Sequence, residues 1–339
     1  MNCQAVGWAV RATGLLALMV IALGLVSGCR LHPQNVGRFE YTRMLMGVRA
    51  DLVVFAANEA EGERLARVGF AEVARLEAMM SDWRAGSELS RLGVAAVGSP
   101  VYVSPELVEV LAGAQRVARA SGGRFDVTVG PLTALWREAR RTGVMAADAT
   151  LAEPRARSGW ALLTVDERAG AVELAREGMR LDVGGIAKGY AAERAVRAME
   201  SAGATAAMAA LAGDVFAGAA RPAVVGRAGG AWEVLAEAGG GGSGEAGRTL
   251  RVVNRAVSTS GDAFQTVEIN GRRMAHLIDA RTGMGAERVY PVTVVAKRGW
   301  VADALASALC LMGPGPEADA LVRGFADEGV EVVFHPAAR

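Results

Sequence analysis

Apolar residues recur at three- and four-residue spacing in several stretches of the chain, which predicts amphipathic helices. The longest stretch covers residues 59–80, where charged residues separate the apolar positions. A second helix is predicted after Ser104, because a serine followed by proline is typical of a helix start and Gly122-Gly123 of a helix end. Further helices are predicted at 187–202 and 300–312.

Short apolar and β-branched runs between these helices predict strands. The predicted strands are 49–55, 161–165, 170–175, 178–183, 206–211, 250–253, 265–269, 291–296 and 330–334. Many of them are joined by short turns, and helices separate clusters of strands. This order favours an α+β fold with a largely antiparallel sheet and packed helices over a doubly wound parallel sheet. No GxGxxG follows a predicted strand and opens a helix, and a Walker-type GxxxxGK[ST] is missing from the sequence, so a Rossmann or P-loop nucleotide site lacks support.

The N-terminal segment has the pattern of an export signal. Residues 13–28 are almost wholly apolar and follow Arg11, as in secretory signals, and they fall short of the roughly 20 apolar residues of a spanning helix. An uncleaved N-terminal anchor is the alternative. The run Val26-Ser27-Gly28-Cys29 resembles the bacterial lipobox, in which the cysteine thiol accepts the lipid. We therefore expect a chain lipid-anchored in a bacterial cell envelope and facing the periplasm or the exterior.

The same segment sets the predicted domain limits. We expect a lipoprotein signal peptide at 1–28, a polar tether at 29–43 that begins with the lipidated Cys29, and one folded domain at 44–339. The glycine-rich stretch 226–248 within that domain predicts a flexible surface loop. Phosphate cradling is the alternative for this stretch, but no predicted strand and helix frame it.

Composition narrows the possible functions. Hydrophobic residues make up 52% and charged residues 22% of the 339 residues, which excludes disorder as a description of the whole chain. A formal charge of +1 and 5% aromatic residues argue against a nucleic-acid partner. With three histidines in the chain, a histidine-rich zinc centre is excluded, so a metal here should be a hard cation held by oxygen.

Three segments carry candidate chemistry. In the first, a predicted strand ends at Asp182, a glycine turn follows and a helix begins near Ala187. Backbone amides at a helix start attract phosphate, and Lys188 adds a positive charge. An ordinary strand–turn–helix corner with a solvated lysine is the alternative. In the second, Asp303 and Ser307 lie one helical turn apart in an otherwise apolar stretch and could reach one magnesium ion, or could be a capping carboxylate and a back-bonding serine.

The third segment is HLIDARTG at 276–283, where His276 stands close to a carboxylate, an arginine and a turn. A lone histidine is more often structural than catalytic, but the polar groups around it make a catalytic role a second possibility.

Together these segments resemble the ApbE family of FAD:protein FMN transferases, and the resemblance covers about 44–315. Ten motifs occur in the family's order. They are Met46-Gly47, MSDWR at 80–84, SELSR at 87–91, FDVTVGPL at 125–132, Leu135-Trp136, LDVGGIAKGY at 181–190, Gly213-Asp214, STSGD at 258–262, HLIDARTG at 276–283 and ADALASAL at 302–309.

The resemblance implies a mixed α/β fold with antiparallel sheets, often likened to the T-fold, and a Mg2+-dependent enzyme. It would transfer FMN from FAD through a phosphoester bond to a threonine of an exported electron-transfer protein, releasing AMP. A FAD pyrophosphatase that gives FMN and AMP, or a non-catalytic flavin-binding lipoprotein, are the alternatives. By resemblance, Met46 and Trp83 would line the flavin site. The remaining positions implied are Arg124, Phe125, Asp126, Asp182 and Lys188 for contacts with FAD, the carbonyl of Gly185 with Asp303 and Ser307 for the metal, and His276 for activation of the acceptor hydroxyl.

Overall fold

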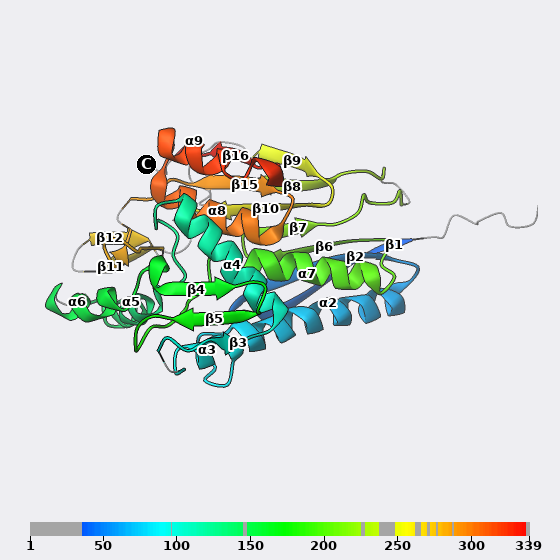
Figure 1. Cartoon of the computed structure of the whole chain (residues 1–339). Helices are drawn as coiled ribbons and strands as arrows, with labels where there is room; N and C mark the ends of the chain where they lie inside the picture. Colours follow the sequence, from blue (N-terminus) through cyan, green and yellow to red (C-terminus); the bar gives the residue numbers. More distant parts are fainter. Residues whose placement is uncertain are drawn as a thin grey trace, which may run out of the picture. The chain divides into compact units, whose positions relative to one another are not determined.

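A seven-stranded sheet forms the centre of the part of the chain that the structure describes (Figure 1). In this computed structural model, the described residues are 36–95, 97–144, 148–224, 228–236, 248–261, 266–269, 272–275, 277–286 and 288–336. Every neighbouring pair in the sheet is antiparallel. The strands, in spatial order, are β1 (Gly37–Leu45), β2 (Val48–Ala56), β6 (Ala206–Leu211), β7 (Asp214–Ala217), β10 (Arg255–Ser260), β15 (Val292–Ala296) and β16 (Glu331–Phe334).

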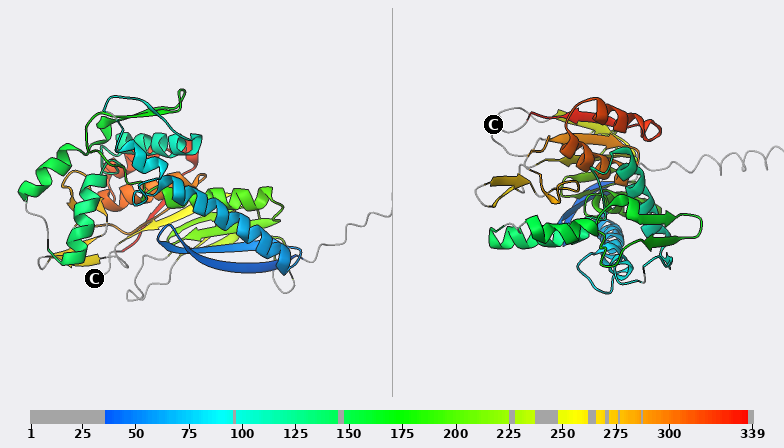
Figure 2. Two further views of the ribbon diagram at one scale, coloured as in Figure 1. Left: turned by 90° about the horizontal axis from the view of Figure 1, so that it is seen from below. Right: turned by 60° about the vertical axis from the view of Figure 1, so that its left-hand side comes forward.

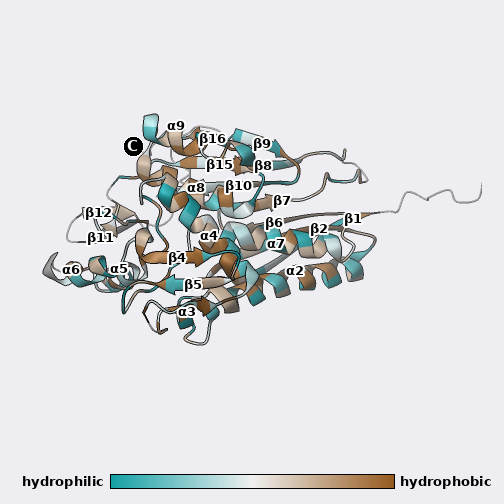
Figure 3. Ribbon diagram, viewed as in Figure 1, coloured by the Kyte–Doolittle hydropathy of each residue, from teal (hydrophilic) through white to brown (hydrophobic). Residues whose placement is uncertain are grey.

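Three helices pack side by side on one face of this sheet. They are α2 (Glu59–Met80), α7 (Ala187–Ser201) and α8 (Gly299–Met312), and α4 (Pro105–Ala120) packs against α8. In Figure 3, α2 alternates between hydrophilic and hydrophobic colours, as expected of a helix with one buried face. Leu52 and Val54 of β2 point toward these helices and are fully buried. This side holds the main hydrophobic core.

The other face of the sheet is covered by a hairpin, β8 (Trp232–Ala236) and β9 (Arg248–Val252). Phe55 points to this side because successive side chains of a strand alternate between faces. Its ring meets the Trp232 ring edge-on at 5.6 Å between centroids, and the Trp232 indole donates to the Ala219 carbonyl at 2.8 Å. The central strands are therefore buried on both faces.

The remaining elements surround one end of the sheet, and Figure 2 shows α5 and the β11–β12 hairpin together at that end. β3, β5 and β4 form a three-stranded sheet, and β11–β12 and β13–β14 are hairpins. The elements are α3 (Glu88–Leu92), β3 (Val101–Tyr102), α5 (Gly130–Thr142), α6 (Asp148–Ala156), η1 (Trp160–Leu162), β4 (Leu163–Asp166), β5 (Ala171–Leu174), β11 (Thr266–Ile269), β12 (Arg272–Ala275), β13 (Ile278–Asp279), β14 (Met284–Gly285), α9 (Pro316–Arg323) and η2 (Ala326–Glu328).

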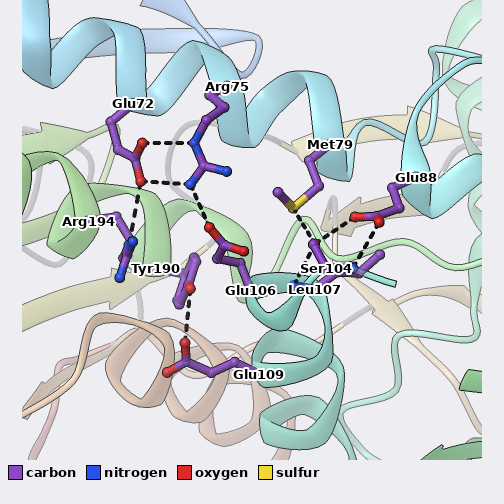
Figure 4. Close-up of polar contacts among 10 residues, drawn as sticks. All are labelled: Glu72, Arg75, Met79, Glu88, Ser104, Glu106, Leu107, Glu109, Tyr190 and Arg194. Atoms are coloured by element: carbon purple, nitrogen blue, oxygen red, sulfur yellow. Dashed lines mark hydrogen bonds and ion pairs between the residues drawn. The ribbon is translucent and has the colours of Figure 1, made fainter. Parts of the chain in front are cut away.

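A polar network joins α2, α4 and α7 near the start of α7 (Figure 4). Arg75 of α2 forms ion pairs with Glu72 and with Glu106 of α4, each at 2.9 Å. The Tyr190 hydroxyl of α7 donates to Glu109 Oε2 of α4 at 2.9 Å. Tyr190 thus ties the first turn of α7, which carries site residues, to α4, and Arg75 ties α4 to α2.

The predicted α+β fold with antiparallel pairing is confirmed, as are the helices at 59–80, after Ser104, at 187–202 and at 300–312. Ser104 caps α4 by accepting a hydrogen bond from Leu107 N, as its position predicts. Three expectations were wrong. Residues 37–43 belong to strand β1 rather than to a tether, 178–183 is not a strand, and residues 232–236 of the predicted loop 226–248 form β8.

The segment 178–183 runs as irregular chain because its backbone groups bond outside a ladder. An isolated bridge joins Arg180 to Val129, and Asp182 N donates to the Val127 carbonyl at 2.7 Å. The predicted signal peptide and Cys29 lie outside the described residues. None of the helices within the described ranges has the length and apolar character that a membrane crossing requires.

Candidate active site

A cavity of about 1020 Å³ collects the candidate residues from both ends of the sequence. Its lining includes every candidate that the structure describes, namely Met46, Trp83, Arg124, Phe125, Asp126, Asp182, Gly185, Lys188, Asp303 and Ser307. His276 lies outside the described residues, but its neighbours Leu277 and Ile278 line the same cavity. These residues are up to 261 positions apart in the sequence (307 − 46), so the fold, not local sequence, brings them together.

The glycine corner before α7 places backbone next to α8. Gly184 N–H donates to Asp182 Oδ1 at 2.9 Å, which closes the turn. A Cβ on Gly185 would lie 3.1 Å from the Ser307 hydroxyl oxygen, so the backbone of the corner comes close to that side chain. α7 then begins at Ala187, and Lys188 follows in its first turn.

Four backbone amides around this corner donate within the protein. Ile186 N–H and Ala187 N–H both donate to the Val183 carbonyl, at 3.1 and 2.9 Å. Gly184 N–H is taken by Asp182, and Gly189 N–H donates to Asp303 Oδ2 at 3.0 Å. The ammonium of Lys188, in the first turn of α7, adds a positive charge at this corner.

Lys188 lies between two buried carboxylates. Its Nζ is 3.0 Å from Asp214 Oδ2, 3.5 Å from Asp303 Oδ2 and 2.8 Å from the Gly184 carbonyl. Asp214 is 4% exposed and Asp303 2%, and Ser258 Oγ donates to the other oxygen of Asp214. The cluster thus joins α7, α8, β7 and β10 at the base of the cavity.

The electrostatics of this cluster favour binding of a cation. Burial raises the pKa of Asp303, the nearby Asp214 carboxylate raises it further, and Lys188 opposes both. Burial lowers the pKa of Lys188, but the two carboxylates outweigh this and raise it. Two carboxylates face one ammonium, so an additional cation would relieve their repulsion. Within the described residues, three or more His, Cys, Asp or Glu side chains with metal-binding geometry do not occur together.

The cavity lining also includes an exposed aromatic ring. Trp83 is 73% exposed, and the guanidinium carbon of Arg137 lies 4.0 Å from its ring centroid. Arg137, from α5, also forms ion pairs with Asp82 at 2.6 Å and Asp182 at 3.5 Å. Burial raises the pKa of Asp82, while Arg137 acts against this shift. Met46 lies at the tip of the β1–β2 hairpin with φ of 51°, beside Gly47.

Asp126, which also lines the cavity, is held by its own turn. Its Oδ1 accepts hydrogen bonds from Thr128 N at 2.8 Å and from Thr128 Oγ1 at 2.7 Å. Burial raises the pKa of Asp126 and these hydrogen bonds lower it, burial being the larger effect. Phe125 is buried beside it, and Arg124 donates to the Leu311 carbonyl of α8 at 3.3 Å. The segment therefore connects the corner before α7 with the C-terminal end of α8.

The model of the ApbE family matches residues 46–334. The chain belongs to the ApbE family. Relatives named FAD:protein FMN transferase include one from Klebsiella pneumoniae, 28% identical over 88% of this chain and 86% of its own. Another, from Vibrio cholerae, is 31% identical over 69% of each chain.

Solved structures agree with this assignment. The flavin transferase ApbE from Vibrio cholerae superposes with a TM-score of 0.74 at 25% identity, over 88% of this chain and 93% of that one. The ApbE protein from Thermotoga maritima gives a TM-score of 0.73 at 24% identity, over 88% and 94% of the two chains, and supports the fold.

Sequence reasoning missed two residues of this ApbE site. Asp214 stands in the Gly213-Asp214 motif, and only the packing of α7 against β7 brings it to Lys188. Arg137 lies in α5, one of three arginines near its end, and sequence does not say which of them faces Trp83. A signal for Arg137 was available, since Thr133, Trp136, Arg137 and Arg140 recur at helical spacing and all four line the cavity.

Proposed function

We propose that this chain is a FAD:protein FMN transferase that moves FMN, through its phosphate, from FAD to a threonine of a target protein. The observation that carries the proposal is one cavity lined both by an exposed tryptophan and by a lysine that lies between buried carboxylates. An aromatic face suits a flavin ring, and a fixed cation suits a diphosphate. The names of the relatives support the same activity.

We also propose that the cation of this site is Mg2+. The donor set fits, because Asp303 and Ser307 lie one turn apart on α8, the Ser307 hydroxyl lies close to the Gly185 backbone, and Mg2+ takes few protein ligands and prefers oxygen. A Mg2+ ion bound there would neutralise charge on the diphosphate oxygens. These three residues would hold it, with Asp303 as the anionic ligand.

The other side chains of the cavity would bind the flavin ring and the phosphates of FAD. Trp83 would stack on the flavin ring, with Met46 beside it, and Arg137 would keep the indole in place. Lys188 would neutralise the phosphate nearest α7, where Asp214 and Asp303 keep the amine protonated. Holding FAD at its flavin and at its phosphate would align the diphosphate for attack, and such positioning supplies much of the rate in phosphoryl transfer.

The reaction forms one bond and breaks one. The threonine oxygen of the target bonds to the phosphorus of the FMN half, the diphosphate P–O bond breaks and AMP leaves. The hydroxyl proton must pass to a base, since a neutral hydroxyl is a poor nucleophile. We propose His276 as that base; Leu277 beside it lines the cavity.

The target and the location are proposals of the same kind. We propose an exported electron-transfer protein as the target, and attachment of the chain to a bacterial envelope membrane through a lipid on Cys29. The apolar run at 13–28 and the lipobox-like residues that end at Cys29 support export and lipidation. Palmitate labelling of the expressed chain, compared with the Cys29→Ser variant, tests the lipid; equal labelling of both would contradict it.

The test of function incubates the purified protein with FAD, Mg2+ and a threonine-bearing fragment of an electron-transfer protein. We expect the fragment to gain one FMN per AMP released, measured by mass spectrometry and chromatography. AMP formed at the same rate without the fragment would instead identify a FAD pyrophosphatase. Tight FAD binding with no AMP, unaffected by chelation, would identify a non-catalytic flavin-binding protein.

A further inference from the structure

Helices α7 and α8 touch through a pair of glycines. A Cβ on Gly189 would lie 2.2 Å from the Gly299 carbonyl oxygen, and a Cβ on Gly299 would lie 1.9 Å from the Gly189 carbonyl oxygen. Real Cβ atoms essentially never come within 3.0 Å of another heavy atom, so no other residue fits either position without moving backbone. The two helix backbones are therefore in direct contact at this point.

Each of these glycines is followed four residues later by a carboxylate that faces the other helix. Gly299 N–H donates to Glu193 Oε2 at 2.7 Å, and Gly189 N–H donates to Asp303 Oδ2 at 3.0 Å. Residues four apart share a helix face, so Gly189 with Glu193 and Gly299 with Asp303 make the same arrangement twice. The first turn of each helix is thus bonded to a carboxylate of the other.

Neither helix has a capping side chain of its own. Ile186 precedes α7 and Arg298 precedes α8, and neither side chain caps its helix. Free N–H groups in the first turn of a helix need an acceptor, and a carboxylate there also interacts favourably with the helix dipole. The exchange of carboxylates meets this need and fixes the two helix starts relative to each other.

We propose that Glu193 is a positioning residue that, by holding the start of α8, sets Asp303 and Ser307 for cation binding. The proposal rests on the metal site of the proposed function. Glu193 is not among the residues that line the cavity, so it would act through Gly299. Asp303 follows Gly299 by one turn and Ser307 by two, and a shift at the helix start would carry both away from Gly185.

Glu200 provides a matched control on the same helix. Its Oε1 accepts a hydrogen bond from Ala219 N at 2.7 Å, so it also ties α7 to another segment through a backbone N–H. That contact lies at the far end of α7, beyond strand β7, and Glu200 does not line the cavity. Loss of Glu200 should therefore lower stability without moving Asp303.

The experiment measures Mn2+ binding by electron paramagnetic resonance, FAD binding by fluorescence and the melting temperature, on the full chain. Glu193→Ala should raise the Kd for Mn2+ about 10-fold or more, the range for loss of a group that orients a metal ligand. Glu193→Gln keeps an oxygen that can accept the Gly299 N–H, so it should restore most of the affinity. Glu200→Ala should leave the Kd for Mn2+ at the wild-type value while lowering the melting temperature.

Two results would overturn the proposal. One is unchanged Mn2+ affinity in Glu193→Ala with a lowered melting temperature, which would leave Glu193 a structural residue. If Glu193→Ala does not fold, Glu193→Asp, whose carboxylate is one methylene shorter, takes its place, and unchanged affinity there has the same meaning. The other is binding of Mn2+ by Asp303→Asn with the wild-type Kd. That result would show that Asp303 is not a metal ligand, and this proposal would lose its basis. Mn2+ binding lost in Asp303→Asn but kept in Glu193→Ala refutes the role of Glu193 alone.

Discussion

The glycine contact between α7 and α8 predicts a large effect from one added methyl group. Gly299→Ala places a Cβ 1.9 Å from the Gly189 carbonyl oxygen, where ordinary contact begins near 3.4 Å. The obstacle is backbone, so the helices must separate. Overpacking of this kind costs about 1–3 kcal/mol, and the better helix propensity of alanine returns at most about 1 kcal/mol. Because the clash is severe, we expect a cost near about 3 kcal/mol, and therefore a net loss of about 2 kcal/mol in the free energy of unfolding.

Urea denaturation measures this loss directly, and a loss of about 2 kcal/mol corresponds to a melting temperature lower by about 3 °C in a domain of this size. Gly86→Ala is the control, because a Cβ there meets nothing within 4 Å and Gly86 has no positive φ. That variant should stay within about 0.5 kcal/mol of the wild type. Equal stability of the two variants would refute the close approach of the helices.

The other predictions concern the cavity. Trp83→Ala should raise the Kd for FAD about fivefold, from about 1 kcal/mol of lost stacking, with little change in stability because Trp83 is 73% exposed; fluorescence titration and melting check both. Asp303→Ala should lower Mg2+-dependent FMN transfer by about 100-fold or more while circular dichroism stays unchanged, since Lys188 keeps its pair with Asp214; normal turnover in Mg2+ would contradict the metal assignment. His276→Ala should lower the transfer rate by about 100-fold but change FAD binding little, and equal losses in both would indicate a binding role. Asp126 has a raised pKa in the folded state, so its proton stabilises the fold below the ordinary carboxyl pKa, and this stabilisation is lost as pH rises through the raised value. Urea denaturation should therefore show that the free energy of unfolding of the wild type increases relative to that of Asp126→Asn as pH falls from 7 to below 4. The same pH dependence of the unfolding free energy in both proteins would refute the raised pKa of Asp126.

Local signals explain why the helices of this fold could be predicted. Ser104 and Pro105 mark the start of α4, and the apolar spacing in 59–80 marks α2, because caps and periodicity act within a few residues. Strand β1 was missed since its outward positions are mostly charged or polar and were interpreted as a tether. Its alternate residues Phe39 and Tyr41 pack onto the core, and its antiparallel pairing with β2 makes the segment a strand.

Some residues of the candidate site could likewise be predicted from local sequence, and others could not. Asp303 and Ser307 could be found from sequence because they are polar residues one turn apart in an apolar helix. Asp214 could not be given a role, because its contact with Lys188 depends on which strand lies beside α7. The partners of the corner amides could not be predicted for a similar reason, since only the folded turn shows that four of them donate to Asp182, Val183 and Asp303.

The central claim is that the cavity joins FMN to a threonine of another protein. The most direct measurement is fragment-ion mass spectrometry of a target fragment incubated with this chain, FAD and Mg2+, beside the same fragment with its threonine changed to alanine. We predict one FMN mass located on the threonine, lost in the alanine fragment and in the presence of a chelator. An unmodified threonine fragment after complete consumption of FAD would contradict the account.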